Sequence, residues 1–124
     1  MPVPFVKIAA ILVAELVGYS RLAGEDEERT LSRLRGLRSD LIDPAIAVHH
    51  GRIVKRTGDG NLIEFRSVVD AVRCGIEMQV GLRERNAGLP AERRIELRVG
   101  VHLGDVVEEA GGDLMATASI SRRA

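Results

Sequence analysis

The chain has 124 residues, of which 45% are hydrophobic, and its 18 Lys and Arg side chains are matched by 18 Asp and Glu side chains. A chain of this length forms one domain and can bury a hydrophobic core. Its zero net charge and 2% aromatic content argue against the basic stripes and base-stacking platforms of nucleic-acid-binding proteins. The single cysteine, Cys74, excludes an internal disulfide and fits a reducing compartment.

The first element expected is a buried strand. Residues 7–18 form a nearly continuous apolar run that ends in glycine, a pattern typical of a strand covered on at least one face. The apolar run from Val3 to Val17, which includes this segment, is interrupted by Lys7 and Glu15, is too short to span a bilayer, and has no small-residue cleavage site. We therefore expect a cytoplasmic protein without a membrane segment.

A helix is expected next, because the acidic residues at 25–28 suit the positive end of a helix dipole. Apolar residues then follow at helical spacing, with arginines on the other face. They are Leu31, Leu34, Leu37, Leu41 and Ile42. Pro44 either kinks this helix or starts its successor, since proline cannot donate the intrahelical hydrogen bond. Gly51 is expected to follow the helix end.

The remaining elements are a hairpin, a helix and a strand. Two short β-prone runs flank the Gly-Asp-Gly sequence at 58–60, which predicts a hairpin. A helix is expected over 68–85, with its core side formed by Val69, Val72, Ile76, Val80 and Leu82. Alternation over 95–103 predicts a strand, and Val106 and Val107 are expected to begin another. This order predicts an α+β fold with an antiparallel-rich, ferredoxin-like sheet and helices on one face.

Two carboxylates stand out by their positions. Glu15 lies inside an apolar strand, and Asp59 lies at the tip of the glycine-flanked hairpin. A carboxylate in a buried strand needs a partner, and two carboxylates together with substrate phosphates are a common way to hold Mg²⁺. Other interpretations stay open, because Gly-Asp-Gly is a common turn sequence and Glu15 can pair with Lys55 or face solvent. The residues alone therefore do not name a function.

Four segments, in order, resemble the catalytic domains of bacterial class III adenylate/guanylate cyclases. The sequence Ala-Glu-Leu-Val-Gly-Tyr-Ser at 14–20 is similar to the family's first metal motif, Ala-Asp-hydrophobic-Val-Gly-aromatic-Ser/Thr. The strand and hairpin at 52–60, Val-Asp-Ala-Val-Arg-Cys at 69–74 and Arg-Val-Gly-Val-His-Leu-Gly-Asp at 98–105 follow at the expected distances. The similarity runs from about residue 7 to residue 113 and implies the cyclase variant of the ferredoxin-like fold.

The resemblance implies a metal and phosphate site. Glu15, Asp59 and the backbone carbonyl of Leu16 would bind two divalent cations, Mg²⁺ or Mn²⁺. Backbone amides at the following turn would hold the β- and γ-phosphates, as unpaired N–H groups near a turn into a helix can do. The residues that would supply these amides are Gly18, Tyr19 and Ser20.

The resemblance also implies a substrate and a partner. Lys55 lies where the family has a base-reading lysine, and Asp113 fits the acid that accepts from the adenine amino group. This pair suits ATP better than GTP. The reaction implied is conversion of ATP to 3′,5′-cyclic AMP and pyrophosphate for intracellular signalling. In the family the metal acids come from one subunit and the base-reading pair from the other, so a homodimer is implied.

The sequence departs from the family at its first metal residue. Glu15 stands where the family has Asp, and the extra methylene moves the carboxylate by about one bond length. Because Mg²⁺ demands near-ideal octahedral distances, we expect weakened or altered metal preference, with Mn²⁺ still tolerated.

A larger departure follows Leu114. The family continues with Tyr-Gly-Asp-Gly-Val-Asn and a later Arg, which orient the ribose and stabilise the transition-state phosphate. Translating GC-rich codons for YGDGVNIARR one nucleotide out of frame gives MATASISRR, the sequence at 115–123. The hypothesis is that 1–114 is a partial cyclase catalytic domain, truncated at its C-terminus, and that 115–124 is an out-of-frame, irregular tail. We then expect no retained transition-state residue and little or no cyclase activity.

Two alternatives belong to other functional classes. One is a catalytically inactive cyclase-like module that binds nucleotide or dimerises, which Glu15 and the tail favour. The other is a generic ferredoxin-like interaction domain, which leaves the two acids and Lys55 unexplained.

Overall fold

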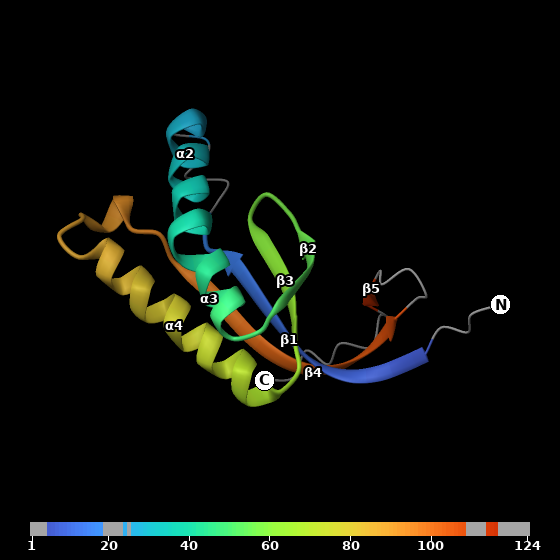
Figure 1. Ribbon diagram of the computed structural model, residues 1–124. Coiled ribbons are helices and arrows are strands. Elements are labelled where there is room, and N and C mark those ends of the chain that lie inside the picture. The colour runs from blue at the N-terminus through green and yellow to red at the C-terminus, as the bar shows by residue number, and fades with distance from the viewer. Residues whose placement is uncertain (1–4, 19–23, 25, 109–113, 117–124) are drawn as a thin grey trace.

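A five-stranded antiparallel sheet, in the order β2-β3-β1-β4-β5, forms the framework of this computed structural model (Figure 1). The strands are β1 (Phe5–Leu16), β2 (Arg52–Arg56), β3 (Gly60–Phe65), β4 (Leu97–Glu108) and β5 (Leu114–Ala116). The structure describes residues 5–18, 24, 26–108 and 114–116. The expected α+β fold with an antiparallel sheet is confirmed.

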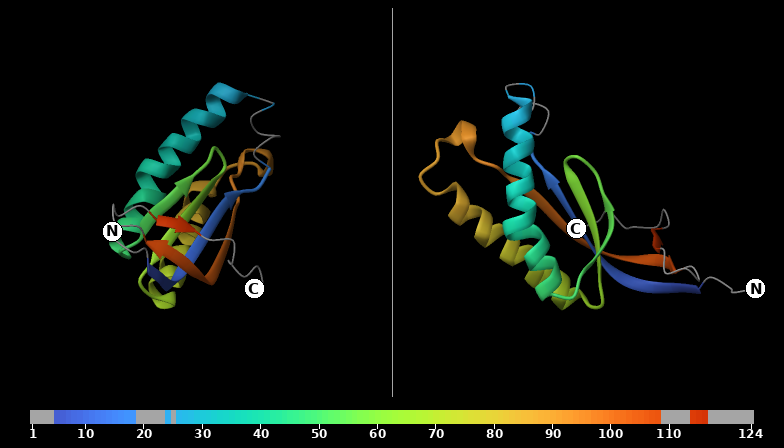
Figure 2. Two further views of the ribbon diagram at one scale, coloured as in Figure 1. Left: turned by 90° about the vertical axis from the view of Figure 1, so that its right-hand side faces the viewer. Right: turned by 45° about the horizontal axis from the view of Figure 1, so that its top comes forward.

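The helices lie on one face of the sheet, as Figures 1 and 2 show from three directions. They are α2 (Glu27–Leu37), the π-helical turn η1 (Arg38–Ile42), α3 (Asp43–Val48), α4 (Val68–Asn86) and the short 3-10 turn η2 (Ala91–Arg93). No helix within the described ranges is both long enough and apolar enough to cross a lipid bilayer.

Strand β1 is central in the sheet, and both of its faces are apolar. Ala10, Leu12 and Ala14 are buried in the main core beneath the helices. On the opposite face Ala9 and Ile11 are also buried, which explains why the β1 sequence is a continuous apolar run rather than an alternating one. The far face is called the open face here, because no helix of the described chain covers it (Figure 2).

The first helical segment runs from Glu27 to Val48 with a widened turn in its middle. Asp26 caps it, since its carboxylate accepts from the backbone N–H of Arg29 at 3.0 Å. At the widened turn the N–H of Asp43 donates to the carbonyl of Arg38, five residues back. Pro44 follows at the start of α3, where it lacks the N–H that a regular helix would use. Of the two alternatives expected for Pro44, a kink in the helix or the start of its successor, the structure shows the second.

Helix α4 packs inward with a different face from the one predicted, and of the five residues expected in the core only Leu82 is buried. Val69, Val72, Ile76 and Val80 were expected in the core, but their exposed fractions are 56%, 41%, 57% and 48%. The residues that pack inward are Ala71, Cys74, Gly75, Met78 and Leu82. Small side chains at three of these positions let the helix lie close to the sheet, and a Cβ on Gly75 would meet Val99 at 3.2 Å. The short distance between α4 and the sheet therefore determines which side of the helix faces the core.

Two strand predictions also differ from the structure. Val106 and Val107 do not begin a new strand, because they continue β4, which reaches Glu108 and pairs with β1 along its whole length. Met115 and Ala116 were expected in an irregular tail, but they lie in β5 and pair with Val107 and Val106. The other residues of that expected tail, 117–124, lie outside the described residues.

Candidate active site

The structure brings Glu15 and Asp59 together at one end of the sheet. In the antiparallel pairing of β1 with β3, Glu15 lies opposite Gly60, the neighbour of Asp59. The backbone N–H of Leu16 donates to the carbonyl of Asp59 at 2.8 Å. The Cγ atom of Glu15 lies 3.6 Å from the point where a Cβ on Gly60 would be, so its side chain leans toward the hairpin tip. Both carboxylate residues are solvent exposed.

Hydrogen bonds from the backbone and side chain of Thr57 stabilise the turn at the hairpin tip. Its backbone N–H donates to the carbonyl of Gly60 at 2.9 Å, and its hydroxyl accepts from the Gly60 N–H at 3.0 Å. The same hydroxyl lies 3.2 Å from a carboxylate oxygen of Asp59, to which it donates. Sequence reasoning missed this role, although Thr before a Gly-Asp-Gly turn has the hydroxyl needed for such local bonds.

Lys55 lies on the same face of the sheet as Glu15. It pairs with Leu62, which pairs in turn with Val13, two residues before Glu15 on β1. Since cross-strand partners share a face and alternate residues return to it, Lys55 projects from the open face beside Glu15. A bulge in β2 between Ile53 and Lys55 sets this register. Lys55 is exposed, and the helices lie on the other side.

Comparison with known proteins gives one family. No protein-family model matches the chain. The chain is 47% identical over 103 residues to putative adenylate cyclase 3 of Rhizobium meliloti (strain 1021). The aligned region covers 83% of this chain but only 18% of that relative. It also superimposes on the crystal structure of an adenylate/guanylate cyclase/hydrolase from Silicibacter pomeroyi, with a TM-score of 0.81 and 40% identity. That match covers 94% of this chain and 67% of the solved one.

The chain belongs to the class III adenylate/guanylate cyclase family. The crystal structure of the guanylyl cyclase Cya2 is also similar, with a TM-score of 0.74 and 25% identity over 95% of this chain and 66% of that one. The sheet and helices of this cyclase domain are therefore those of adenylyl and guanylyl cyclases alike.

The two acids of the cyclase domain fit a site for divalent cations. Carboxylate oxygens are preferred ligands of Mg²⁺, which usually takes one or two of them and fills its other positions with water and phosphate oxygens. Within the described part of the chain, no group of three or more His, Cys, Asp or Glu side chains is placed to share a metal ion. A cation held by Glu15 and Asp59 would take its further ligands from water and phosphate oxygens.

Arg98 is a neighbour of this site that sequence reasoning missed. It lies directly opposite Glu15 on β4, so the two side chains share the open face. Arg98 and Val17 also line a cavity of about 670 Å³ between the end of α4 and the start of β4, together with Arg83, Arg94 and Glu96. The alternation of the strand at 95–103 was the signal that could have placed Arg98 beside Glu15.

The expected phosphate turn is described only at its start. Gly18 follows β1 with a φ of 71°, a left-handed conformation that favours glycine. Val17, just before it, donates its N–H to the carbonyl of Glu96 at 2.9 Å, which fixes where the turn begins. The other predicted substrate residues, Tyr19, Ser20 and Asp113, lie outside the described residues.

Proposed function

We propose that this domain is part of an adenylate cyclase of cytoplasmic signalling, that it binds ATP together with two divalent cations, Mg²⁺ or Mn²⁺, and that the altered sequence after Leu114 impairs its turnover. The observation that supports this most directly is the approach of Glu15 and Asp59, joined by the 2.8 Å bond from Leu16 to the Asp59 carbonyl. Membership of the cyclase family supports the reaction class but leaves ATP and GTP as alternatives, since the similar proteins include both adenylate and guanylyl cyclases.

In the proposed site each group has a defined task. Glu15, Asp59 and the Leu16 carbonyl would hold the cations, and the amides of Gly18, Tyr19 and Ser20 would hold the β- and γ-phosphates. Divalent cations bound there would lower the pKa of the ribose 3′-hydroxyl and stabilise the attacking and leaving oxygens. The hydroxyl would lose its proton to solvent and its oxygen would attack the α-phosphorus, so that the bond from this phosphorus to the oxygen bridging to the β-phosphate breaks and pyrophosphate leaves, with cyclic AMP as the other product.

Base recognition would come from a second copy of the chain. Lys55 and Asp113 would contact the adenine of an ATP whose phosphates lie on the partner's acids, so two sites would form across a homodimer. Lys55 is exposed on the open face beside Glu15, as a residue that reaches a neighbouring subunit must be.

A thermal-shift titration with Mn²⁺ and ATP tests the proposal. We expect the melting temperature to rise only when both are present, because the two acids leave most coordination positions to phosphate oxygens. Asp59→Asn should remove the rise. Glu84→Gln, an exposed change on α4, should leave it intact. An equal shift for wild type and Asp59→Asn would refute the site.

One alternative function is favoured by a specific residue. Glu15 in place of the family's Asp suits a module that binds nucleotide without turning it over. The two are separated by measuring cyclic AMP under conditions where the thermal shift is saturated. Binding without product supports the module, and binding with product supports the enzyme.

A further inference from the structure

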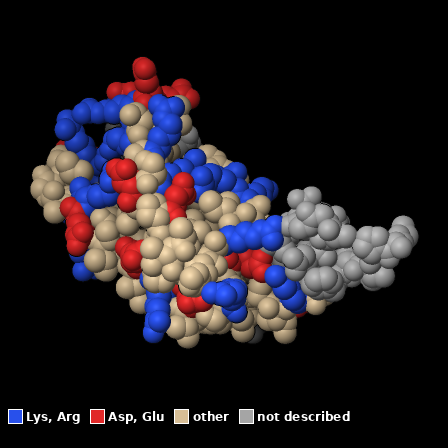
Figure 3. Space-filling view, viewed as in Figure 1, with Lys and Arg blue, Asp and Glu red and all other residues tan. Residues whose placement is uncertain are grey.

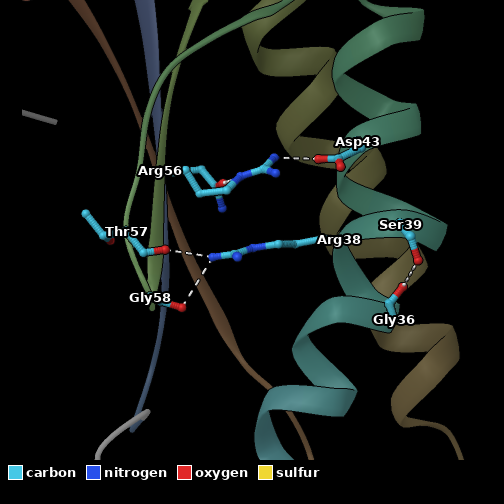
Figure 4. A network of polar contacts seen from close by, with 8 residues as sticks. Gly36, Arg38, Ser39, Asp43, Arg56, Thr57 and Gly58 are labelled. Atoms are coloured by element: carbon cyan, nitrogen blue, oxygen red, sulfur yellow. Dashed lines mark hydrogen bonds and ion pairs between the residues drawn. The ribbon is translucent and has the colours of Figure 1, made fainter.

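The tip of the metal-site hairpin is tied to the helical layer by one arginine. The guanidinium Nη2 of Arg38 donates to the backbone carbonyl of Thr57 at 2.7 Å and to that of Gly58 at 3.3 Å (Figure 4). These two carbonyls immediately precede Asp59. Arg38 and Asp59 also border the same small cavity, next to Leu16 and Asn61. The hydrogen bonds of Arg38 therefore hold the hairpin at the proposed site itself, next to Asp59.

The widened helical turn places Arg38 for this contact. Arg38 is the first residue of η1, and the bond from the Asp43 N–H to its carbonyl spans five residues instead of four. Asp43, at the other end of that turn, accepts from Arg56 at 2.5 Å, and Arg56 also donates to Asn61 at 2.8 Å. Both ends of the π-helical turn thus hold the same hairpin, as Figure 4 shows. Such turns occur often at functional sites.

Asp59 is consequently fixed from two sides. On the sheet side its carbonyl accepts from Leu16 of β1. On the helix side the two residues before it are held by Arg38. Hydrogen bonds from a charged group to a carbonyl are stronger than those between neutral groups. The two bonds from Arg38 therefore limit the movement of the exposed hairpin tip.

We propose that Arg38 is a positioning residue for the cation site, which keeps the Asp59 carboxylate beside Glu15. This inference rests on the proposed function of that carboxylate pair. The positioning role and the charge of Arg38 predict opposite changes in cation affinity when the side chain is removed. A guanidinium near a cation site repels the cation, so removal of its charge alone would strengthen cation binding. If positioning dominates, removal of Arg38 weakens binding instead.

The test measures Mn²⁺ binding by electron paramagnetic resonance, well below the melting temperature, in the presence of ATP. We expect Arg38→Met to weaken Mn²⁺ binding about tenfold. This is the change in affinity that corresponds to the loss of one hydrogen bond from a charged group, here the bond that orders the hairpin tip. Arg38→Lys keeps the charge and one donor and should recover most of that loss. The matched control is Arg35→Met, which removes the same charge from an exposed position one turn earlier and should change binding less than about twofold.

A second measurement does not depend on metal. Without cations, Arg38→Met should speed amide hydrogen exchange at Thr57 and Gly60, whose N–H groups close the hairpin turn, while Arg35→Met should not. If Arg38→Met does not fold, Arg38→Lys carries the same measurements, with a smaller weakening expected.

The outcomes separate this inference from the function on which it rests. Wild-type protein that binds no Mn²⁺ with ATP would overturn the proposed function and the cation role of Arg38 together. Wild-type protein that binds Mn²⁺, with Arg38→Met equal or tighter, would overturn the positioning role alone. Weaker binding together with faster exchange at the tip, both recovered by lysine, supports it.

Discussion

The backbone N–H of Leu16 donates to the carbonyl of Asp59 at 2.8 Å, so the end of β1 and the tip of the β2–β3 hairpin are joined by a direct hydrogen bond. Because of this bond, the distance between the backbones of the two acids is set by the pairing of the strands and not by two loops that move independently. Glu15 precedes Leu16, and its partner across the strands is Gly60, which has no side chain to obstruct it. The geometry of the pair therefore depends on side-chain length more than on backbone movement.

The first prediction follows from that length. Glu15→Asp shortens the side chain by one methylene and places the carboxylate at the length that the family uses. We expect the variant to gain Mg²⁺ affinity relative to Mn²⁺ by about tenfold, since Mg²⁺ is the stricter of the two about coordination distance. The measurement is the Mg²⁺ and Mn²⁺ concentration at half-maximal thermal shift with ATP. Glu96→Asp serves as the control. An unchanged ratio of the two midpoints would contradict the prediction.

The second prediction concerns the two faces of α4. Met78 is fully buried, and Ile76 is 57% exposed. Met78→Ala should reduce the free energy of unfolding by about 2–5 kcal/mol, because it leaves a cavity in the core. Ile76→Ala should change it by about 0.5 kcal/mol or less. Urea denaturation of both variants checks this. The opposite ranking would mean that α4 presents its valine and isoleucine face to the core.

That face was the largest error of the sequence interpretation. Both sides of α4 have helical spacing, so periodicity alone could not choose between them. Hydropathy favoured a side with Val69, Val72, Ile76 and Val80 over one made of Ala, Cys, Gly and Met, and Leu82 alone was both expected and found in the core. The structure uses the smaller residues because the helix lies close against the sheet. Figure 3 shows the helix-side surface that results, with residues other than Lys, Arg, Asp and Glu over α3 and α4 and both acidic and basic side chains around them.

The positions of Glu15 and Asp59 in the fold were more predictable than the inward face of α4. Asp59 was placed correctly at the hairpin tip because Gly-Asp-Gly has strong local turn chemistry, and the apolar run before Glu15 marked a strand. The sheet order that makes these elements neighbours is a long-range property, and it entered through the family resemblance. Arg38 could not be recognised from sequence, because its contact depends on the π-helical turn, and the other arginines of the helix look the same in the pattern.

The third prediction compares two glycines. A Cβ on Gly51 would lie 2.7 Å from the Phe65 ring and 2.9 Å from Ile46, both buried. Gly51→Ala should therefore destabilise the protein by about 1–3 kcal/mol through overpacking. Near the end of α2, within the helical segment that continues to Val48, a Cβ on Gly36 would meet only the end of the Arg85 side chain, at 3.7 Å. Gly36→Ala should stabilise by about 0.5–1 kcal/mol through helix propensity. Thermal denaturation that moves both variants in one direction would contradict this assignment.

The fourth prediction concerns alkaline pH. Burial raises the pKa of the Cys74 thiol from its ordinary 9.0 to about 12, and the charge of Glu77 adds to the increase. In the unfolded chain the thiol ionises near its ordinary pKa, while in the folded chain it stays neutral. Above about pH 9 the unfolded state therefore binds fewer protons, and the free energy of unfolding falls as pH rises, by about 1.4 kcal/mol per unit at most. This loss ends near pH 12, where the folded thiol also ionises.

Cys74→Ala isolates this contribution, because lysine and tyrosine side chains titrate in the same range in both proteins. Cys74 is fully buried, so alanine introduces a small cavity and a constant loss of stability at neutral pH. Urea denaturation at intervals from pH 8 to pH 11 should show that loss shrinking as pH rises, since only the wild type has a buried thiol to keep neutral. A difference between the two proteins that stays constant across the series would mean that the thiol ionises equally easily in the folded and unfolded chains, contrary to its position on the buried side of α4.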